Sequence, residues 1–382
     1  MTVDIAVLDS PRAVEPAIAE WDRLAVDGGL PYCAPGWLMA WWRHAAPQGA
    51  LLRVVAAREG GRLVGVAPFY AVPWRAGVWI WSLLATEISS RIEPMGAPGV
   101  REALAGAVAA GSPTPARIDL DGVPANSPWP ALLGSAGPGD RPAWQLRRPA
   151  IPASVVALAG GTVDEWLGTR SSNFRAQMRR ARRKVEADGG AFRVASSPEE
   201  IERDLVHFER LHNARWDWRG GSSALPSGAL GMLADAGRAL GPERFQLVSL
   251  ELGGKVISSQ LFLSAGTETS YWNGGFDDAY ASYKPSLITL VEAIRMSLEQ
   301  GRTRFDLGPG AQDYKDRFTG EQDEIVWQSL IPRGRRYALA RALHAPTQAR
   351  GELGRRLAPE QKQKLKRLLR RSAAAPPRRE RP

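Results

Sequence analysis

The 382-residue chain is 44% hydrophobic and 24% charged, an ordinary composition for a globular protein of two domains. Its net charge of +10 lies mostly in residues 351–382, where eleven Lys or Arg face three Glu, so the rest of the chain is close to neutral. A single cysteine, Cys33, excludes an intrachain disulfide and a CxxC metal site. No signal-peptide pattern and no run of 18 apolar residues occurs, so we expect a cytoplasmic protein without a bound metal.

A long-range repeat relates the two halves of the chain. Residues 53–70 align without gaps with residues 246–263, at an offset of 193, and both segments read as a β-hairpin with a Gly-Gly turn. Two shorter pairs keep the same order at an offset of 187: EWDRL (20–24) with HFERL (207–211), and RIDL (117–120) with RFDL (304–307). Unrelated α/β domains also share hairpins and apolar helices, but three ordered matches favour duplication.

The repeated unit is predicted to be a helix, an antiparallel hairpin, a strand, a helix and a further strand. In the second copy, the strand after the hairpin is predicted at Thr269–Phe276. The next helix is predicted to begin near Pro285, and the last strand is predicted at Thr303–Leu307. The Pro-rich passage Gly111–Ser154 is interpreted as one strand followed by a linker. The sequence therefore predicts domains at 1–150 and 151–340, with a basic tail at 341–382 that is partly helical or disordered.

Two charged segments of the second half are candidates for function. Residues 171–186 predict a helix with a basic face that includes Arg175 and Arg179, which either binds a phosphate or is simply solvated. The strand at 303–307 runs into a Gly-Pro-Gly break and then into DYKDR (313–317). Loops after strands commonly carry the working residues of α/β proteins, although a solvated charged turn is the alternative.

Four segments together resemble a known family: LHNARWDWRGG (211–221), ELGGKVISSQLFL (251–263), YWNGGFDDAYASYKPSLI (271–288) and RTRFDLGPGAQDYKDRF (302–318). They are similar to the GNAT-like acyltransferases, specifically the bacterial branch associated with cellulose or exopolysaccharide synthesis. That branch is related to the Fem-type aminoacyl transferases, which also contain two GNAT-like halves. The resemblance implies an α/β fold of two tandem GNAT-like domains, with mixed sheets flanked by helices and a splay between two central parallel strands.

The resemblance also implies a donor site. Acetyl-CoA or another acyl-CoA would be the co-substrate, with its thioester in the splay and its pyrophosphate at the loop 281–286, before the predicted helix. The implied cofactor-binding residues are Tyr283, Lys284, Ser286 and Arg317. The glycine-rich phosphate loop of typical GNAT enzymes is missing, and Ser286 stands where the family often has glycine.

Tyr314 and Lys315 match an aromatic-lysine pair of the Fem-type relatives, and this implies the catalytic centre. An ammonium in a dry cleft stabilises the oxyanion of acyl transfer, and a tyrosine hydroxyl can protonate a leaving thiolate. A structural lysine paired with Asp313 or Asp316 is the alternative. Asp306 is a candidate proton acceptor, although its counterpart Asp119 in the first half favours an architectural role for both.

The remaining site candidates are less specific. His212 is a candidate general base, against the alternative of a packed or helix-capping histidine. The substrate-binding candidates are Trp272, Asn273, Asp313, Arg175 and Arg179.

The expected function is acyl transfer to an amine or hydroxyl of a small molecule, such as a sugar or an envelope or exopolysaccharide precursor. The alternatives are a Fem-type transferase that uses aminoacyl-tRNA, and a non-catalytic accessory protein that keeps the fold. The basic tail either contacts an anionic membrane surface or nucleic acid, or is a solvated appendage.

Overall fold

The computed structural model describes residues 3–137, 142–216, 225, 228–334 and 336–345. The chain consists of two compact units, residues 1–333 and 334–382. The described part of the second unit contains a helix over residues 337–345, and the basic tail after residue 345 lies outside the described residues. None of the described helices is long and apolar enough to span a membrane.

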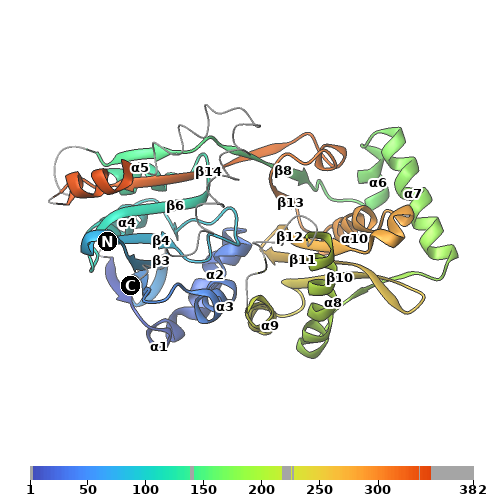
Figure 1. Ribbon diagram of the computed structural model, residues 1–382, viewed down its shortest axis with the longest axis horizontal. Coiled ribbons are helices and arrows are strands. Elements are labelled where there is room, and N and C mark those ends of the chain that lie inside the picture. Colours follow the sequence, from blue (N-terminus) through green and yellow to red (C-terminus); the bar gives the residue numbers. More distant parts are fainter. Residues whose placement is uncertain (1–2, 138–141, 217–224, 226–227, 335, 346–382) are drawn as a thin grey trace, which may run out of the picture. The chain divides into compact units, whose positions relative to one another are not determined.

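A 14-stranded mixed sheet is the framework of the first unit (Figure 1). Its main path runs β1-β2-β3-β4-β6-β14-β8-β13-β12-β11-β10-β9, with β5 beside β3 and β7 beside β14. The strands are β1 (Asp4–Leu8), β2 (Leu51–Glu59), β3 (Arg62–Pro73), β4 (Trp79–Leu83), β5 (Met95–Gly96), β6 (Pro115–Pro124), β7 (Trp144–Arg147), β8 (Ile151–Ala157), β9 (Ala191–Val194), β10 (Phe245–Leu252), β11 (Lys255–Ala265), β12 (Glu268–Phe276), β13 (Arg304–Pro309) and β14 (Gln322–Ile331). Helices flank this sheet, which confirms the predicted α/β architecture.

The two hairpins of the repeat have the same register. Arg58 pairs with Leu63 between β2 and β3, and Glu251 pairs with Val256 between β10 and β11, again an offset of 193. A β-bulge directly precedes Arg58 in one hairpin and Glu251 in the other. Because bulges are specific features that a strand pair keeps, their common position supports duplication of one ancestral unit.

Each copy also contains one parallel strand pair. β4 pairs with β6 in the first copy, with Ser82 opposite Asp119. β12 pairs with β13 in the second, with Ser270 opposite Asp306. The two central parallel strands that the resemblance implies are therefore present in both copies.

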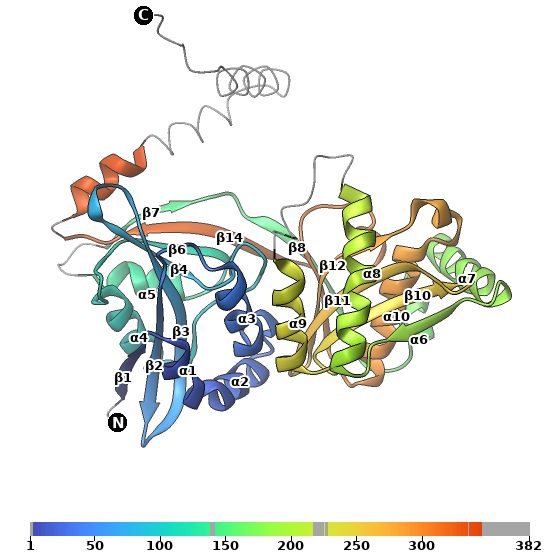
Figure 2. The same cartoon turned by 60° about the horizontal axis from the view of Figure 1, so that its bottom comes forward.

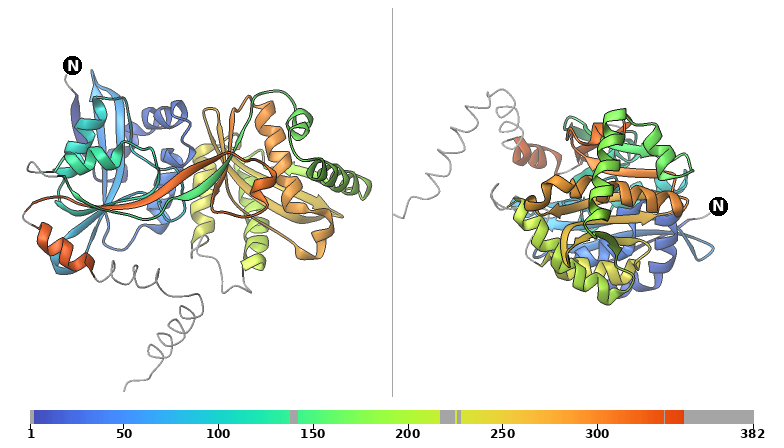
Figure 3. Two further views of the ribbon diagram at one scale, coloured as in Figure 1. Left: turned by 90° about the horizontal axis from the view of Figure 1, so that it is seen from above. Right: turned by 90° about the vertical axis from the view of Figure 1, so that its right-hand side faces the viewer.

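One strand of the second copy joins the sheet of the first (Figure 3). β14 lies near the end of the second copy but pairs with β6 of the first, whereas β8, at the start of the second copy, pairs with β13 of the same copy. β8 and β14 also pair with each other, so the two sheets are continuous.

The interpretation of Gly111–Ser154 as one strand and a linker was wrong: the passage also contains helix α5 (Trp129–Ser135) and strand β7, which extend the structure of the first copy.

Alternating side chains of the strands pack into two separate cores. Leu261 and Leu263 of β11 lie in a core shared with the first copy, and Phe262 between them lies in a core of the second copy alone. The main helices are α1 (Pro11–Val14), α2 (Ile18–Asp27), α3 (Pro35–Ala45), α4 (Val100–Ala109), α6 (Val163–Gly168), α7 (Ser172–Ala187), α8 (Pro198–Trp216), α9 (Ala229–Leu240) and α10 (Pro285–Glu299). α3 and α9 pack side by side across the junction of the copies, which joins them into one unit (Figure 2).

Helix α8 lies unusually close to β12. A Cβ atom added to Gly275 would lie 2.2 Å from the carbonyl carbon of Leu211 and 2.4 Å from the backbone nitrogen of His212. These are backbone atoms of a long helix, so they cannot move aside as a flexible side chain would. The second glycine of the YWNGGF segment is therefore required for the packing of this helix on the strand.

Gly275→Ala is expected to lower the free energy of unfolding by about 1–3 kcal/mol, because the added methyl group overpacks this contact. The control is Gly106→Ala in α4, where an added Cβ meets no atom within 4 Å. That change should be neutral or stabilising by up to about 1 kcal/mol, since alanine is the better helix former. Urea denaturation measures both, and equal stabilities of the two variants would contradict the prediction.

Candidate functional site

A cavity opens where β12 and β13 separate. The two strands are paired up to Ser270 and Asp306, and directly beyond this pair lies a cavity of about 350 Å³. Its lining comes from both copies: Tyr32, Ile88, Ser89, Ser90, Tyr271, Trp272, Asn273, Leu307, Gly308, Pro309, Gln312, Tyr314 and Lys315. The predicted splay thus contains a cavity, and the Gly-Pro-Gly break forms part of its wall.

The first copy fills the corresponding place with its own chain. After β4, the segment 84–95 packs against the end of β6, where the backbone N–H of Ile92 donates to the carbonyl of Gly122 (3.2 Å). Leu84 and Ile92 are fully buried. The same segment then supplies Ile88, Ser89 and Ser90 to the cavity of the second copy. The first copy therefore contributes a wall to the cavity of the second.

Lys315 is buried at the floor of this cavity. It begins the 3₁₀ turn η6 (Lys315–Arg317), and its Nζ donates to the carbonyl oxygens of Gly308 (2.7 Å), Pro309 (3.1 Å) and Gly310 (3.3 Å). All three ammonium protons thus have acceptors within the loop. Burial lowers the pKa of Lys315 to about 8, opposed by the Asp306 carboxylate. The lysine pairs with neither Asp313 nor Asp316 in the described residues; its hydrogen bonds go to the loop carbonyls.

Asp306 directly precedes the lining residue Leu307, is not itself part of the cavity lining, and is 1% exposed. One oxygen, Oδ1, accepts from the backbone N–H of Gly308 (2.7 Å), and Oδ2 has no hydrogen-bond partner among the described residues. Burial, followed by the charge of Glu268, raises the pKa of Asp306 to about 6, against the Gly308 N–H and the cations Arg91 and Arg304. A buried carboxylate with a free oxygen is able to accept a proton.

A network of charged side chains fixes the floor of the site. Glu268 pairs with Arg91 from the wall segment and with Arg304 of β13 (2.8 Å). Arg304 also contacts Asp323 of β14 (2.7 Å), and Ser270 donates to Glu268 (3.1 Å). The network ties the wall segment of the first copy to the two separating strands of the second.

Three further predicted residues line the cavity. Trp272 donates from Nε1 to the carbonyl of Ile88 (2.7 Å), and its ring packs edge-on against Trp37. The side-chain oxygen of Asn273 accepts from the backbone N–H of Gly274 (2.9 Å). Tyr314 packs its ring edge-on against Phe318. Trp272 is therefore fixed by both copies.

The predicted phosphate loop is largely occupied by contacts within the protein. The Tyr283 hydroxyl bonds to Asp188 (2.7 Å), and Gln260 donates to the Ser286 carbonyl (2.9 Å) and hydroxyl (3.1 Å). Lys284 is exposed and adopts a left-handed conformation (φ 53°) before α10. Pro285, the first residue of that helix, has no N–H to offer. Pro285 thereby removes one of the amides with which a helix start typically holds pyrophosphate.

The other predicted site residues lie outside the cavity. His212 is fully buried in α8, with its ring stacked on Phe208. Asp313 is exposed, Arg175 bonds to the carbonyls of Gly168 and Arg170, and Arg317 contacts Gln177 (3.3 Å).

The basic face of α7 is solvent-exposed. Arg179, Arg180 and Arg183 make no hydrogen bond or ion pair within the described part of the chain. The segment after Trp216 in the LHNARWDWRGG motif lies outside the described residues.

Sequence reasoning missed the contribution of the first copy. Tyr32 and Ser90 belong to no recognisable motif, and Arg91 and Glu268 are far apart in the sequence. Only the repeat offered a signal, since the segment after β4 is longer than its counterpart after β12 and contains no repeat match. In the described residues, no group of three His, Cys, Asp or Glu side chains is placed to hold a metal ion.

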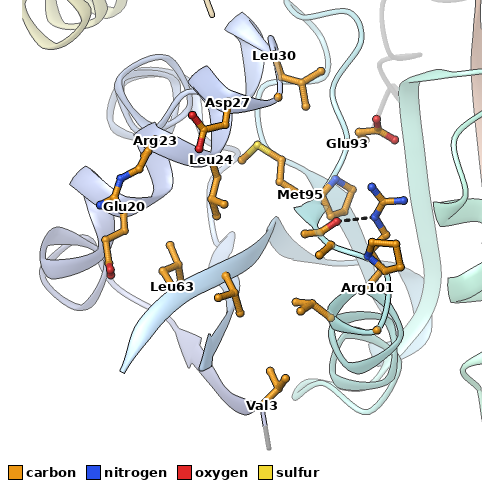
Figure 4. A pocket seen from close by; sticks show the side chains of 18 of the residues that line it. Val3, Glu20, Arg23, Leu24, Asp27, Leu30, Leu63, Glu93, Met95 and Arg101 are labelled. Carbon is orange, nitrogen blue, oxygen red and sulfur yellow. Dashed lines mark hydrogen bonds between the residues drawn. The ribbon is translucent and has the colours of Figure 1, made fainter. Parts of the chain in front are cut away.

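A larger cavity of about 850 Å³ lies in the first copy (Figure 4). Glu20, Arg23 and Asp27 of α2 lie on one side of it, and Arg101 of α4 lies across from them. Arg101 donates to the carbonyl of Gly96 (2.6 Å). None of the residues predicted from the sequence as a site lines this cavity, and its rim carries charges of both signs.

Comparison with known proteins agrees with this geometry. Residues 172–316 match the family model described as an acetyltransferase (GNAT) domain. No curated protein matches the sequence. Neither the match nor the structures below name cellulose or exopolysaccharide synthesis, so that finer branch stays a prediction.

Several solved structures share the fold. FemX is 13% identical with a TM-score of 0.57, and the match covers 81% of this chain and 92% of FemX. The C-terminal domain of an Agrobacterium fabrum protein described as a lysylphosphatidylglycerol synthetase is 12% identical with a TM-score of 0.55, covering 87% and 96%. A Bacteroides thetaiotaomicron protein of unknown function is also 12% identical with a TM-score of 0.55, covering 86% and 100%. The chain therefore shares the overall fold of these structures, and its residues 172–316 are similar to a GNAT acetyltransferase domain.

Proposed function

We propose that this protein is an acyltransferase whose reaction takes place in the cavity between β12 and β13. The observation that carries the proposal is the opening of the parallel pair directly beyond Ser270 and Asp306, with Lys315 buried in it. A carbonyl placed there would lie beside the Lys315 ammonium. The family match over residues 172–316 supports the same reaction class.

The proposed reaction joins the acyl carbon to an amine or hydroxyl and breaks its bond to the carrier. The Asp306 carboxylate accepts the proton of the attacking group through its free Oδ2. The Lys315 ammonium holds the loop 308–310 and places a positive charge near the developing oxyanion. The proton then passes from Asp306 to the leaving carrier, with Tyr314 as a candidate relay that gives its proton to the carrier and regains one from Asp306, so that charges and protons balance.

The first candidate donor is an acyl-CoA, as expected for a GNAT-like domain. Lys284 and Arg317 are exposed and are the proposed contacts to its phosphates, with Tyr283 and Ser286 beside them. Calorimetry with acetyl-CoA tests this donor, and acetohydroxamate formation from acetyl-CoA and hydroxylamine tests transfer without knowledge of the natural acceptor. If acetyl-CoA neither binds nor reacts, an acyl-CoA donor is ruled out.

The second candidate donor is an acyl group esterified to tRNA. Two observations favour it: Pro285 at the start of α10 has no N–H for a pyrophosphate, and Arg179, Arg180 and Arg183 of α7 are exposed without a hydrogen bond or ion pair in the described part of the chain. Each phosphate contact made by a cation steepens the dependence of binding on salt.

Replacing Arg179, Arg180 and Arg183 together with alanine should reduce the slope of log K against log salt for tRNA by about 2 to 3. Fluorescence anisotropy with labelled tRNA over a salt series measures this slope. Arg238→Ala is the control, because that arginine is already paired with Glu202 and Asp235. Equal slopes for wild type and the triple variant would eliminate α7 as a contact to tRNA.

The proposed acceptor is a small molecule with an amine or hydroxyl, such as a sugar or an envelope or exopolysaccharide precursor. Trp272 and Asn273 are the proposed contacts, because they line the cavity next to Lys315. Asp313, at the exposed end of the loop, is a further proposed contact.

A further inference from the structure

We propose that Tyr32, which belongs to the first copy, is a catalytic residue of the site in the second copy and donates a hydrogen bond to the oxyanion formed during acyl transfer. This inference rests on the proposed function, since it assigns a role within that reaction. The site would then be composite. The second copy supplies Asp306 and Lys315, and the first copy supplies the hydroxyl of Tyr32, which donates the hydrogen bond to the oxyanion.

Tyr32 is held rigidly at the cavity. It lies in the 3₁₀ turn η2 (Pro31–Cys33), whose last carbonyl accepts from Nε1 of the buried Trp21 (2.9 Å). Its ring packs edge-on against Trp37 with the ring centres 6.1 Å apart. The side chain is 3% exposed and lines the same cavity as Lys315. A donor held in place in this way needs no reorganisation when charge develops.

The hydroxyl of Tyr32 lies at the point where the strands part. It is 3.5 Å from the carbonyl oxygen of Tyr271, the first residue of β12 after the last parallel pair. That distance is at the upper limit of a hydrogen bond, so little is lost when the hydroxyl turns to another acceptor. Burial and the charges of Asp306 and Glu268 raise the pKa of Tyr32 well above its usual value, so it keeps its proton.

Lys315 is less free to act as this donor. Its three ammonium protons are donated to three carbonyls of the loop 308–310. If one of them were donated to the oxyanion instead, a contact that shapes the cavity would break. In the proposed step the nucleophile bonds to the acyl carbon, its proton goes to Asp306, and the oxyanion accepts from Tyr32. On collapse the bond to the carrier breaks, and the carrier takes the proton from Asp306.

The test is Tyr32→Phe, which keeps the ring and its packing on Trp37. Acetohydroxamate is measured from hydroxylamine and either acetyl-CoA or 3′-O-acetyladenosine, a small ester that mimics the end of an acylated tRNA. The expected result is a fall in kcat of about 100-fold or more with KM changed by less than about threefold, because the bond forms only in the transition state. The control, Tyr70→Phe, removes another buried tyrosine hydroxyl, which bonds to Glu87 (3.3 Å) outside the cavity.

The outcomes separate the two proposals. If wild type forms acetohydroxamate and Tyr32→Phe is equally fast, the role of Tyr32 is overturned while acyl transfer stands. If wild type is inactive with both donors, acyl transfer fails, and the catalytic role of Tyr32 fails with it. The placement of Tyr32 is then decided by the ¹⁹F resonance of 3-fluorotyrosine at position 32: a shift on adding either donor supports the composite site, and no shift contradicts it.

Discussion

Lys315→Met is expected to reduce acyl transfer by about 100- to 1000-fold while the protein still folds. Methionine fills the volume of the lysine stem but removes the positive charge near the oxyanion and the three bonds to the loop 308–310. The free energy of unfolding should fall by about 1–3 kcal/mol, since the loop carbonyls lose their donor. Turnover of acetohydroxamate and urea denaturation measure the two effects.

The matched control is Lys255→Met, which removes a half-exposed lysine paired with Asp277 (2.7 Å) at the surface. It should leave turnover unchanged, since that pair lies outside the cavity. The pH dependence gives a second readout. Because the pKa of Lys315 is about 8, its charge is lost as the pH rises through that value, and the wild-type rate should fall above it. Normal turnover by Lys315→Met would instead favour a non-catalytic accessory protein.

The secondary-structure elements of the fold were predictable because each of them follows from a local, periodic pattern of residues that occurs in both copies. The hairpins, the parallel strands and the start of α10 follow from alternating apolar residues, Gly-Gly turns and Pro285. The pairings of β8 with β13 and of β14 with β6 were not predictable, because no local pattern specifies the partner of either strand. The same holds for α5 and β7 within the Pro-rich passage, where tertiary pairing overrides a linker-like composition.

The site was only partly predictable, for a related reason. The DYKDR segment drew attention through its charge, and Lys315 and Tyr314 do lie at the cavity. His212 was selected by residue type, yet it is packed inside α8. Tyr32 and Ser90 reach the cavity only because the two copies join edge to edge, which no spacing in the sequence encodes.

The repeat also supplies a matched pair of aspartates. Asp119 accepts from Arg117 (2.7 Å) and from Ser329 (2.7 Å), so both of its oxygens are occupied. Asp306 occupies the equivalent position, but Arg304 contacts Glu268 and Asp323 instead, and one carboxylate oxygen of Asp306 has no hydrogen-bond partner among the residues that the structure describes. The sequence favoured an architectural role for both aspartates. The contacts of Asp119 agree with that role, whereas the contacts of Asp306 differ from those of Asp119.

Asp306→Asn is expected to reduce transfer by at least about 100-fold and yet to stabilise the protein at neutral pH. The amide cannot accept the proton of the nucleophile. The folded-state pKa of about 6 lies above the ordinary value of 3.8, so the native state binds more protons between these values and wild-type stability falls as the pH rises through them. The asparagine variant has no such titration, so its free energy of unfolding does not decrease over this pH range. For the wild type the decrease amounts to about 3 kcal/mol at most above pH 6.

Asp119→Asn should behave in the opposite way, because it weakens the contacts that both carboxylate oxygens make, to Arg117 and to Ser329. A destabilisation of about 1–2 kcal/mol is expected, with turnover retained in the remaining folded protein. Urea denaturation at pH 4 and pH 7.5, together with the pH dependence of turnover, compares the pair. The wild-type rate should rise as Asp306 loses its proton near pH 6. If both variants lose stability and neither loses turnover, the two aspartates are architectural alike, and the reaction does not use Asp306.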